Sequence, residues 1–375
     1  MTTVVQCVNN LDVGGVETLV LGLSAELSHR GSRVKICCIE DEGGLAPEAR
    51  SMGVEVRALN MADRGKYRAL REFRAYLRSD APIVIHSHNF KPGWYASAAR
   101  GLGIVQGHVH TKHGVYSASS RGLWRYRLMR VGVDAFVAVS QESRDQLARL
   151  ASVRAERVAI VSNGVDIALC QPSSRREALR AELGIPPDRR IVVNVARLSP
   201  EKDLGSLLHA FRRIHDTLAR TELWLIGDGP ERGRLEALAS DLEIAQCVTF
   251  MGMRADVPRL LPAADLFCLS SLSEGLPIAL LEAMACGLPI VATSVGDVPR
   301  ALLGDLCGLV VPPNDPYLLA VTCLDLLQDG ARRAQMGTRS RSRAVDSFSL
   351  GVMAAEYARL YDETLTGRLL PGGAP

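Results

Sequence analysis

The stretch 273–292 holds the clearest group of residues that could do chemistry, because two acids, Glu274 and Glu282, stand in it with seven residues between them. Pro277 suits the first position of a helix, and the backbone N–H groups of 276–279 would then be free to bind a phosphate. A carboxylate beside a bound diphosphate would be repelled by it. Glu282, within the helix, is therefore better suited to accept hydrogen bonds from neutral hydroxyls such as those of a ribose. Glu274, in the loop, could do the same for a sugar beyond the diphosphate.

The alternative interpretation gives these two acids no binding role: one is an ordinary loop residue and the other an ordinary surface residue of the helix. It leaves unexplained why a helix begins between flanking glycines just after a predicted strand. We therefore predict a donor-binding segment here, and its residues are Glu274, Gly275, Leu276, Pro277, Ile278 and Glu282.

Two cations, Arg197 and Lys202, follow the predicted strand 191–195 in a loop that leads into a helix. Arginine can bind a diphosphate through two parallel hydrogen bonds, and lysine can bind it as a point charge. Lys202 is the only lysine after residue 112, since the other 21 basic residues from 169 onward are all arginine. A pair of solvated surface charges is the alternative, and the isolated lysine favours the binding role.

A glycine-containing turn, 227–231, follows the next predicted strand and reads Gly-Asp-Gly-Pro-Glu. It is equally typical of a plain turn with a helix cap and of a backbone that closely approaches a nucleotide. Gly252, which follows the strand after that, lies in a segment whose backbone could recognise a base. Gly227 and Gly252 are accordingly included among the predicted donor-binding residues.

Five of the eight histidines lie within 28 residues of one another, on two predicted strands and just beyond them. Alternation on a strand would turn two pairs to common faces, so a metal site must be considered. No cysteine or acidic residue joins them at ligand spacing, and ordinary core or surface histidines are the alternative. These residues are His86, His88, His108, His110 and His113.

Together with Gly14-Gly15-Val16-Glu17 near the start, these motifs resemble those of the retaining glycosyltransferases of family 4, across nearly the whole chain and most specifically in 190–293. A narrower resemblance is to bacterial exopolysaccharide sugar transferases. The family resemblance implies the GT-B arrangement, an α/β fold of two tandem Rossmann-like domains facing across a cleft. It also implies that the donor is a nucleotide diphosphate sugar.

The resemblance implies roles for individual residues as well. Arg197 and Lys202 would hold the donor diphosphate, and Glu282 would hold the ribose. Glu274 would contact the transferred sugar. His113 would position that sugar and stabilise charge in the transition state. On the first domain, the residues whose backbone would approach the diphosphate are Gly14 and Gly15.

The elements that must position these residues alternate between Val/Ile-rich runs and amphipathic stretches, which is typical of βα units with parallel sheets. We place a linker at about 164–175, between a domain of 1–168 and a donor domain of 169–349. The resemblance also implies that the last helix, about 350–375, packs back on the first domain. The expected strands are 3–8, 34–39, 54–59, 83–86, 104–110, 135–139 and 158–161, then 191–195, 223–226, 248–250, 266–269 and 289–293.

Composition narrows the class of protein. Of the 375 residues 47% are apolar, enough for two cores, and the nine cysteines include no C-x-x-C pair. We interpret them as small core residues in a reducing compartment. The first residues do not resemble a signal peptide, and no apolar run is long enough to span a membrane. We expect a cytoplasmic protein that can bind peripherally to the membrane.

Charge is distributed unevenly, since residues 1–168 carry 22 basic and 16 acidic side chains and the rest carry 22 and 25. A basic first half, with an amphipathic stretch at 66–78, suits an anionic membrane surface or a phosphorylated acceptor. We expect a sugar or lipid-linked acceptor and no nucleic acid.

The sequence thus predicts a retaining glycosyltransferase that needs no metal or other cofactor. A nicotinamide-dependent oxidoreductase is disfavoured because neither first βα loop contains G-x-G-x-x-G. A hydrolysing nucleotide-sugar epimerase and a non-catalytic nucleotide-sugar-binding protein of the same fold remain alternatives.

Overall fold

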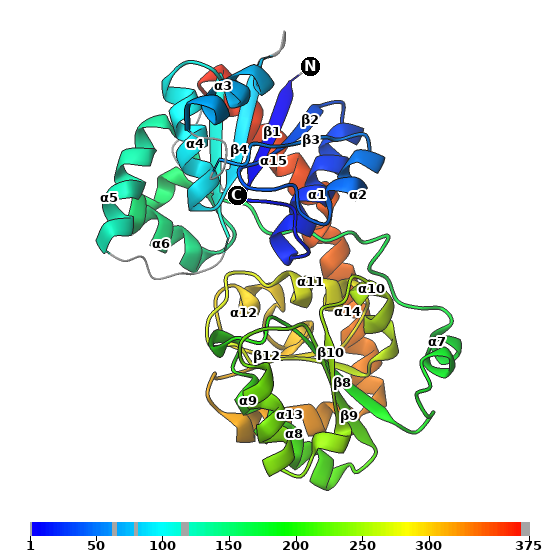
Figure 1. Ribbon diagram of the computed structural model, residues 1–375. Helices are drawn as coiled ribbons and strands as arrows, with labels where there is room; N and C mark the ends of the chain where they lie inside the picture. The colour runs from blue at the N-terminus through cyan, green and yellow to red at the C-terminus, as the bar shows by residue number, and fades with distance from the viewer. Residues whose placement is uncertain (1, 62–65, 79–81, 114–119, 369–375) are drawn as a thin grey trace. The chain divides into compact units, whose positions relative to one another are not determined.

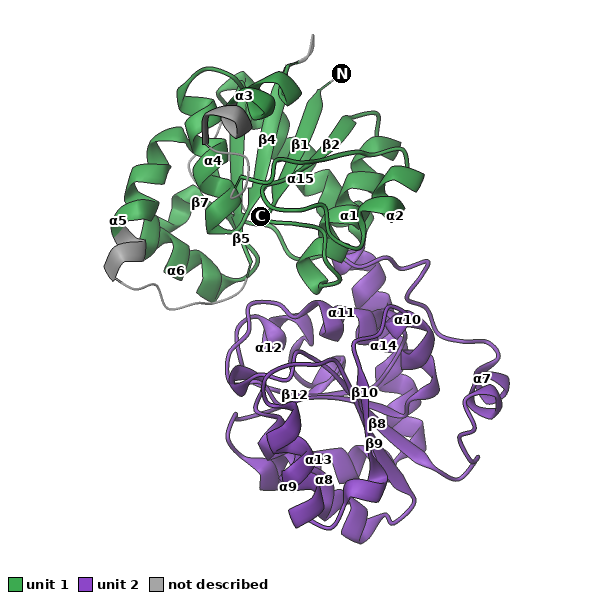
Figure 2. Ribbon diagram, in the orientation of Figure 1, with its two compact units in different colours: residues 1–164, 350–375 green, residues 165–349 purple. Residues whose placement is uncertain are grey.

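The computed structural model describes residues 2–61, 66–78, 82–113 and 120–368 and contains two compact α/β units (Figure 1). Unit 1 comprises 1–164 and 350–375, and unit 2 comprises 165–349 (Figure 2). The division falls four residues before the position placed from the sequence, because Val165 already pairs with Ser349. The last helix, α15 (Leu350–Thr366), contacts α1 and β5 of unit 1. Residues 369–375 lie outside the described part.

Unit 1 is built on a seven-stranded parallel sheet in the order β3-β2-β1-β4-β5-β6-β7. The order reverses between β1 and β4, and in such sheets ligands bind beyond the carboxyl ends of the strands at this reversal. The strands are β1 (Thr3–Val8), β2 (Arg33–Cys38), β3 (Glu55–Ala58), β4 (Ile83–His88), β5 (Gly107–Lys112), β6 (Ala135–Ala138) and β7 (Val158–Ile160). The helices, besides α15, are α1 (Gly15–His29), α2 (Ala46–Ser51), α3 (Lys66–Tyr76), α4 (Phe90–Gly101), α5 (Ser120–Met129) and α6 (Gln141–Ala151).

Unit 2 repeats this plan with a six-stranded parallel sheet in the order β10-β9-β8-β11-β12-β13, which reverses between β8 and β11. The strands are β8 (Arg190–Val195), β9 (Thr221–Ile226), β10 (Val248–Gly252), β11 (Leu266–Leu269), β12 (Ile290–Thr293) and β13 (Leu309–Val311). The helices are α7 (Arg176–Glu182), α8 (Leu204–Thr217), α9 (Arg232–Asp241), α10 (Val257–Leu260), α11 (Ile278–Ala285), α12 (Val298–Ala301), α13 (Pro316–Gln328) and α14 (Gly330–Phe348).

Both faces of the unit 2 sheet are covered by apolar helix surfaces, which is why its strands are continuous Val, Ile and Leu runs. Helices α8, α9 and α13 share one buried cluster with the sheet. Helices α10, α11 and α14 contribute to the cluster on the other face. All nine cysteines are buried and free, which confirms their interpretation as core residues.

Besides small shifts of strand ends, three differences from the sequence prediction matter. Strand β5 begins at Gly107 rather than 104, because Ile104 still donates its N–H to the carbonyl of Ala99 at the end of α4. Strand β13 was not predicted. Pro277 is the N-cap of α11 with extended backbone (ψ 128°), so the first helical residue is Ile278. Within the described part of the chain, no helix has the length and apolar character needed to cross a bilayer.

Candidate active site

The loops after β8 and β11 bring two predicted site residues into direct contact. Lys202 ends a short 3₁₀ turn after β8, and Glu274 lies in the loop after β11, 72 residues further along the chain. The Lys202 Nζ donates to Glu274 Oε1 at 2.6 Å, and both side chains are mostly buried. Ser271 Oγ donates to the same oxygen at 2.7 Å. The pair therefore lies at the strand-order reversal of unit 2, where ligands of such sheets bind.

Two further hydrogen bonds hold these loops against each other. The hydroxyl of Ser270 donates to the carbonyl oxygen of Lys202 at 2.8 Å. The backbone N–H of Leu272 donates to the carbonyl oxygen of Glu201 at 2.9 Å. The Lys202–Glu274 pair is thus fixed by backbone contacts as well as by its own charges.

Arg197 is exposed near the end of β8, and its carbonyl oxygen accepts a hydrogen bond from the N–H of Ser199 at 2.9 Å. The turn after β9 packs directly beside it. Gly227 has φ 134°, and a Cβ there would lie 2.0 Å from the carbonyl oxygen of Ala196, so only glycine fits. Its N–H donates to Gly252 at 2.8 Å. Arg197, Gly227 and Gly252 therefore lie at the carboxyl edge of the unit 2 sheet.

The N-terminus of α11 is open. Its N-cap, Pro277, has no side-chain acceptor, so among the described residues no N-cap side chain pairs with the first N–H groups of the helix, which begin at Ile278. The preceding loop is held by a segment that sequence reasoning missed. The N–H of Asp297 donates to the carbonyl of Gly275 at 2.9 Å. A Cβ at Gly296 would lie 2.2 Å from the carbonyl oxygen of Glu274. No local motif could have linked these two stretches.

Glu282 lies in the second turn of α11 and is partly exposed. Burial raises the pKa of its carboxyl to about 7, well above the ordinary value. A carboxyl with this pKa gains from a ligand that donates hydrogen bonds to its ionised form.

In unit 1, the predicted glycines lie at the carboxyl end of β1. Gly14 is the N-cap of α1, with no side-chain cap, and Gly15 is its first residue. Glu17 lies in the first turn, where burial raises the pKa of its carboxyl. A backbone hydrogen bond to this carboxyl lowers the pKa and partly offsets burial, whereas the first turn of α11 contains no acid.

His113 directly follows β5 and is buried. Its Nε2 lies 2.9 Å from Nδ1 of His88, and its Nδ1 has no partner among the described residues. Burial and the neighbouring Lys112 charge lower the pKa of His113 to about 4, so its imidazole is neutral at neutral pH.

The other four clustered histidines are buried and hydrogen-bonded too. Burial lowers the pKa of each of them. Among the residues that the structure describes, no group of three or more histidine, cysteine or acidic side chains is arranged to hold a metal. The partners of the four are Tyr361 and Thr111 for His86, Gln6 for His88, Ser87 and Gly132 for His108, and Ser87 for His110.

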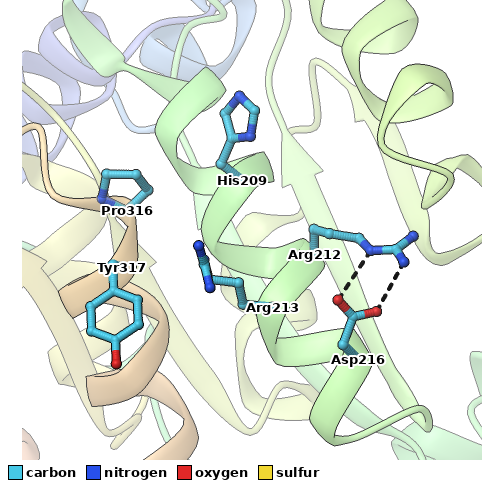
Figure 3. A pocket seen from close by; sticks show the side chains of 6 residues that line it. All are labelled: His209, Arg212, Arg213, Asp216, Pro316 and Tyr317. Carbon is cyan, nitrogen blue, oxygen red and sulfur yellow. Dashed lines mark hydrogen bonds and ion pairs between the residues drawn. The ribbon is translucent and has the colours of Figure 1, made fainter.

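A surface pocket of about 350 Å³ lies elsewhere in unit 2, between α8 and α13 (Figure 3). Arg212 is paired with Asp216, and the guanidinium of Arg213 lies 5.3 Å from the ring centre of Tyr317. None of the predicted donor-binding residues lines this pocket. It is therefore separate from the Lys202–Glu274 site.

Comparison with known proteins connects this geometry to a family. Residues 13–169 match the model for Glycosyltransferase Family 4, and residues 175–343 match that for Glycosyl transferases group 1. A GDP-mannose-dependent alpha-(1-6)-phosphatidylinositol monomannoside mannosyltransferase of Mycolicibacterium smegmatis is 32% identical, over 76% of this chain and 78% of its own. A D-inositol 3-phosphate glycosyltransferase of Corynebacterium efficiens is 27% identical, over 97% and 93%.

Solved structures agree on the fold. Anabaena Alr3699/HepE in complex with UDP-glucose superposes with a TM-score of 0.83 at 21% identity, covering 97% of this chain and 100% of that one. WaaG, described as a glycosyltransferase involved in lipopolysaccharide biosynthesis, gives a TM-score of 0.75 at 19% identity, covering 96% and 99%. With two doubly wound units and both family models matched, the chain belongs to the family 4 glycosyltransferases of the GT-B fold.

Proposed function

We propose that this glycosyltransferase moves a sugar from a nucleotide diphosphate donor to a glycan, lipid-linked or small-molecule acceptor, with retention of configuration and without a metal. The observation that carries the proposal is the Lys202–Glu274 pair beside the uncapped N-terminus of α11. A diphosphate needs positive charge and N–H donors, and this edge of the sheet offers both.

In the proposed reaction the bond between the anomeric carbon and the diphosphate oxygen breaks. A bond from that carbon to an acceptor oxygen forms on the same face, and the acceptor proton leaves with the diphosphate. Arg197, Lys202 and the α11 amides would stabilise the charge that develops on the departing oxygen. Glu274 would contact the sugar, and Glu282 the ribose. Gly14, Gly15 and His113 would contribute from unit 1.

The relatives guide the choice of acceptor. Two of them are named for inositol phosphate and phosphatidylinositol mannoside chemistry. We propose an acceptor used in exopolysaccharide or other cell-surface glycan synthesis, reached from the cytoplasmic side of the membrane.

Turnover is expected to survive exhaustive chelation, because protein cations and amides hold the diphosphate. A panel of nucleotide sugars is first screened by thermal shift, since a bound ligand raises the unfolding temperature by mass action. The best donor is then assayed with and without a chelator, and the product's anomeric proton coupling reports the configuration. Loss of activity that magnesium or manganese restores would refute metal independence. Release of free sugar without transfer to any acceptor would favour the hydrolysing alternative.

Unit 1 carries surfaces that suit an anionic membrane. Trp124 and Leu128 on α5 are each more than half exposed, and the guanidinium of Arg125 lies 5.7 Å from the Trp124 ring centre. Arg74 on α3 and Arg78, two residues beyond its end, line a pocket of about 600 Å³. The side chains of 66–70, the other part of the predicted amphipathic stretch, lie outside the described residues. Exposed aromatic and basic side chains together are typical of interfacial docking.

Reversing two charges on α5, with Arg125→Glu and Arg127→Glu, is expected to abolish binding to vesicles that contain anionic lipid. Wild-type binding should weaken as salt rises, because ions screen surface charges over about 10 Å at 0.1 M. Sedimentation with anionic and with neutral vesicles measures both effects. A control with the same charge change, Arg332→Glu with Arg339→Glu on α14 of unit 2, should bind normally. Wild-type binding that ignores salt and lipid charge would contradict the proposal.

A further inference from the structure

A chain of three buried side chains leads from β1 to His113. Gln6 lies on β1, His88 ends β4, and His113 follows β5; none of the three is more than 6% exposed. His88 Nε2 lies 2.8 Å from Gln6 Oε1, and His88 Nδ1 lies 2.9 Å from His113 Nε2. We call these three side chains the Gln6–His88–His113 relay.

The relay fixes which nitrogen of each ring carries the hydrogen. Burial lowers the pKa of both histidines, so each is a neutral imidazole with one donor and one acceptor nitrogen. An amide oxygen can only accept, so His88 must donate from Nε2 to Gln6. His88 Nδ1 is then an acceptor, and His113 must donate to it from Nε2. Nδ1 of His113 is left as a bare acceptor, and this buried atom has no partner among the described residues.

A strained residue holds the same ring from the backbone side. Asn89 has φ 66° and ψ 177°, a conformation almost confined to glycine. In it, Asn89 donates its N–H to the carbonyl of Thr111 at 2.9 Å. Its Oδ1 accepts the backbone N–H of His113 at 3.2 Å. Such strain persists only where its surroundings over-determine it, and here it ties the end of β4 to the residue after β5.

We propose that Gln6 and His88 are positioning residues that hold His113 as its Nε2–H tautomer, so that Nδ1 accepts a hydrogen bond from a substrate hydroxyl. The contact with substrate rests on the role proposed above for His113. The tautomer itself does not, because the three side chains define it in the free protein. The ligand class is therefore a sugar that still carries the hydroxyl at this position, and a deoxy analogue would leave Nδ1 unpaired.

The tautomer is tested by long-range ¹H–¹⁵N correlation on ¹⁵N-histidine-labelled protein without any donor. The wild type should show the His113 hydrogen on Nε2. In His88→Leu, the His113 ring loses the nitrogen that accepts its Nε2–H. In Gln6→Leu, His88 is no longer held with its hydrogen on Nε2. Both tautomers of His113 should therefore appear in each variant. The kcat should then fall about tenfold, the factor that corresponds to one ordinary hydrogen bond. At a pH where both rings stay neutral, Gln6→Glu keeps an acceptor oxygen facing His88 and should retain the wild-type tautomer.

The matched control is Ser87→Ala on the same strand. Ser87 Oγ bonds His108 and His110 on the opposite face of β4, so its loss disturbs a buried polar network without touching the relay. It should change neither the His113 tautomer nor kcat. A wild-type His113 with its hydrogen on Nδ1 would overturn the proposal, and so would an unchanged tautomer in both leucine variants. If no donor supports turnover, the proposed function fails while the tautomer measurement still decides the relay.

Discussion

Replacing Lys202 with alanine is expected to lower turnover by roughly 10²–10³, the usual effect of removing one preorganised group that stabilises developing charge. Lys202 is mostly buried and lies 2.6 Å from Glu274, so its charge is weakly screened by water. Without it, Glu274 would face the diphosphate as an uncompensated like charge. Steady-state kinetics with the donor found by thermal shift measures the loss. Lys35→Ala is the matched control, because Lys35 is also a buried lysine paired with a glutamate, at 3.4 Å, within unit 1.

The contact between the two side chains also predicts how their variants combine. Glu274→Gln should reduce kcat in the wild-type background, since Glu274 contacts the sugar where charge develops. In the Lys202→Ala background, Glu274→Gln should reduce kcat by a smaller factor. It should also recover part of the affinity for nucleoside diphosphate there, because it removes the unpaired carboxylate. Residues in direct contact typically show such coupling. Strictly additive effects on both kcat and affinity would argue against a shared site.

Glu282→Gln is expected to weaken nucleoside diphosphate binding by about 10–150-fold, because a hydrogen bond to a charged group is worth roughly 1.5–3 kcal/mol. Its kcat at saturating donor should change far less, since the ribose lies away from the bond that breaks. Titration calorimetry with nucleoside diphosphate and turnover with the full donor separate the two effects. Equal losses of affinity in Glu274→Gln and Glu282→Gln would show that the roles are assigned wrongly.

The raised pKa of Glu282 gives this prediction a pH dependence. Burial raises the pKa to about 7, so the ionised acceptor form declines as pH falls through that value. Wild-type affinity should decline with it, and binding near pH 7 should release a proton, which calorimetry in buffers of different ionisation enthalpy detects. The stability effect has the opposite sense: the protonated carboxyl stabilises the fold fully below its ordinary pKa of 4.5, and this contribution is lost as pH rises through about 7. Glu282→Gln should remove the contribution of this carboxyl to both dependences.

Sequence reasoning predicted that the proposed site residues lie at strand ends, because strand ends can be predicted from sequence. Arg197, Gly227 and Glu274 each follow a buried apolar run, and the carboxyl ends of parallel strands meet at one edge. The contact of Lys202 with Glu274 could not be predicted in the same way. It requires β8 and β11 to be neighbours, which the strand order decides and a local motif does not.

The relay illustrates a second limit. The alternation of His86 and His88 predicts a shared face, and the structure places both on one side of β4. Nothing in the sequence indicates that Gln6 from another strand lies within hydrogen-bonding distance of His88. A ring's tautomer depends on such distant partners. The sequence left open whether these histidines bind a metal or fill the core, and only the hydrogen-bond partners describe what each one does.

The return of α15 to unit 1 has a consequence for synthesis on the ribosome. Two buried polar groups of unit 1, the Nδ1 of His86 and the hydroxyl of Thr111, are paired with Tyr361 and Tyr357 of that helix. Buried groups without such partners cost free energy, so unit 1 cannot complete its polar core until these tyrosines have emerged. Unit 2, whose residues are contiguous, is fully translated before then. The half of the nascent chain that is made first therefore cannot complete its core until the last helix has been made, unlike an N-terminal domain that folds as a unit during synthesis.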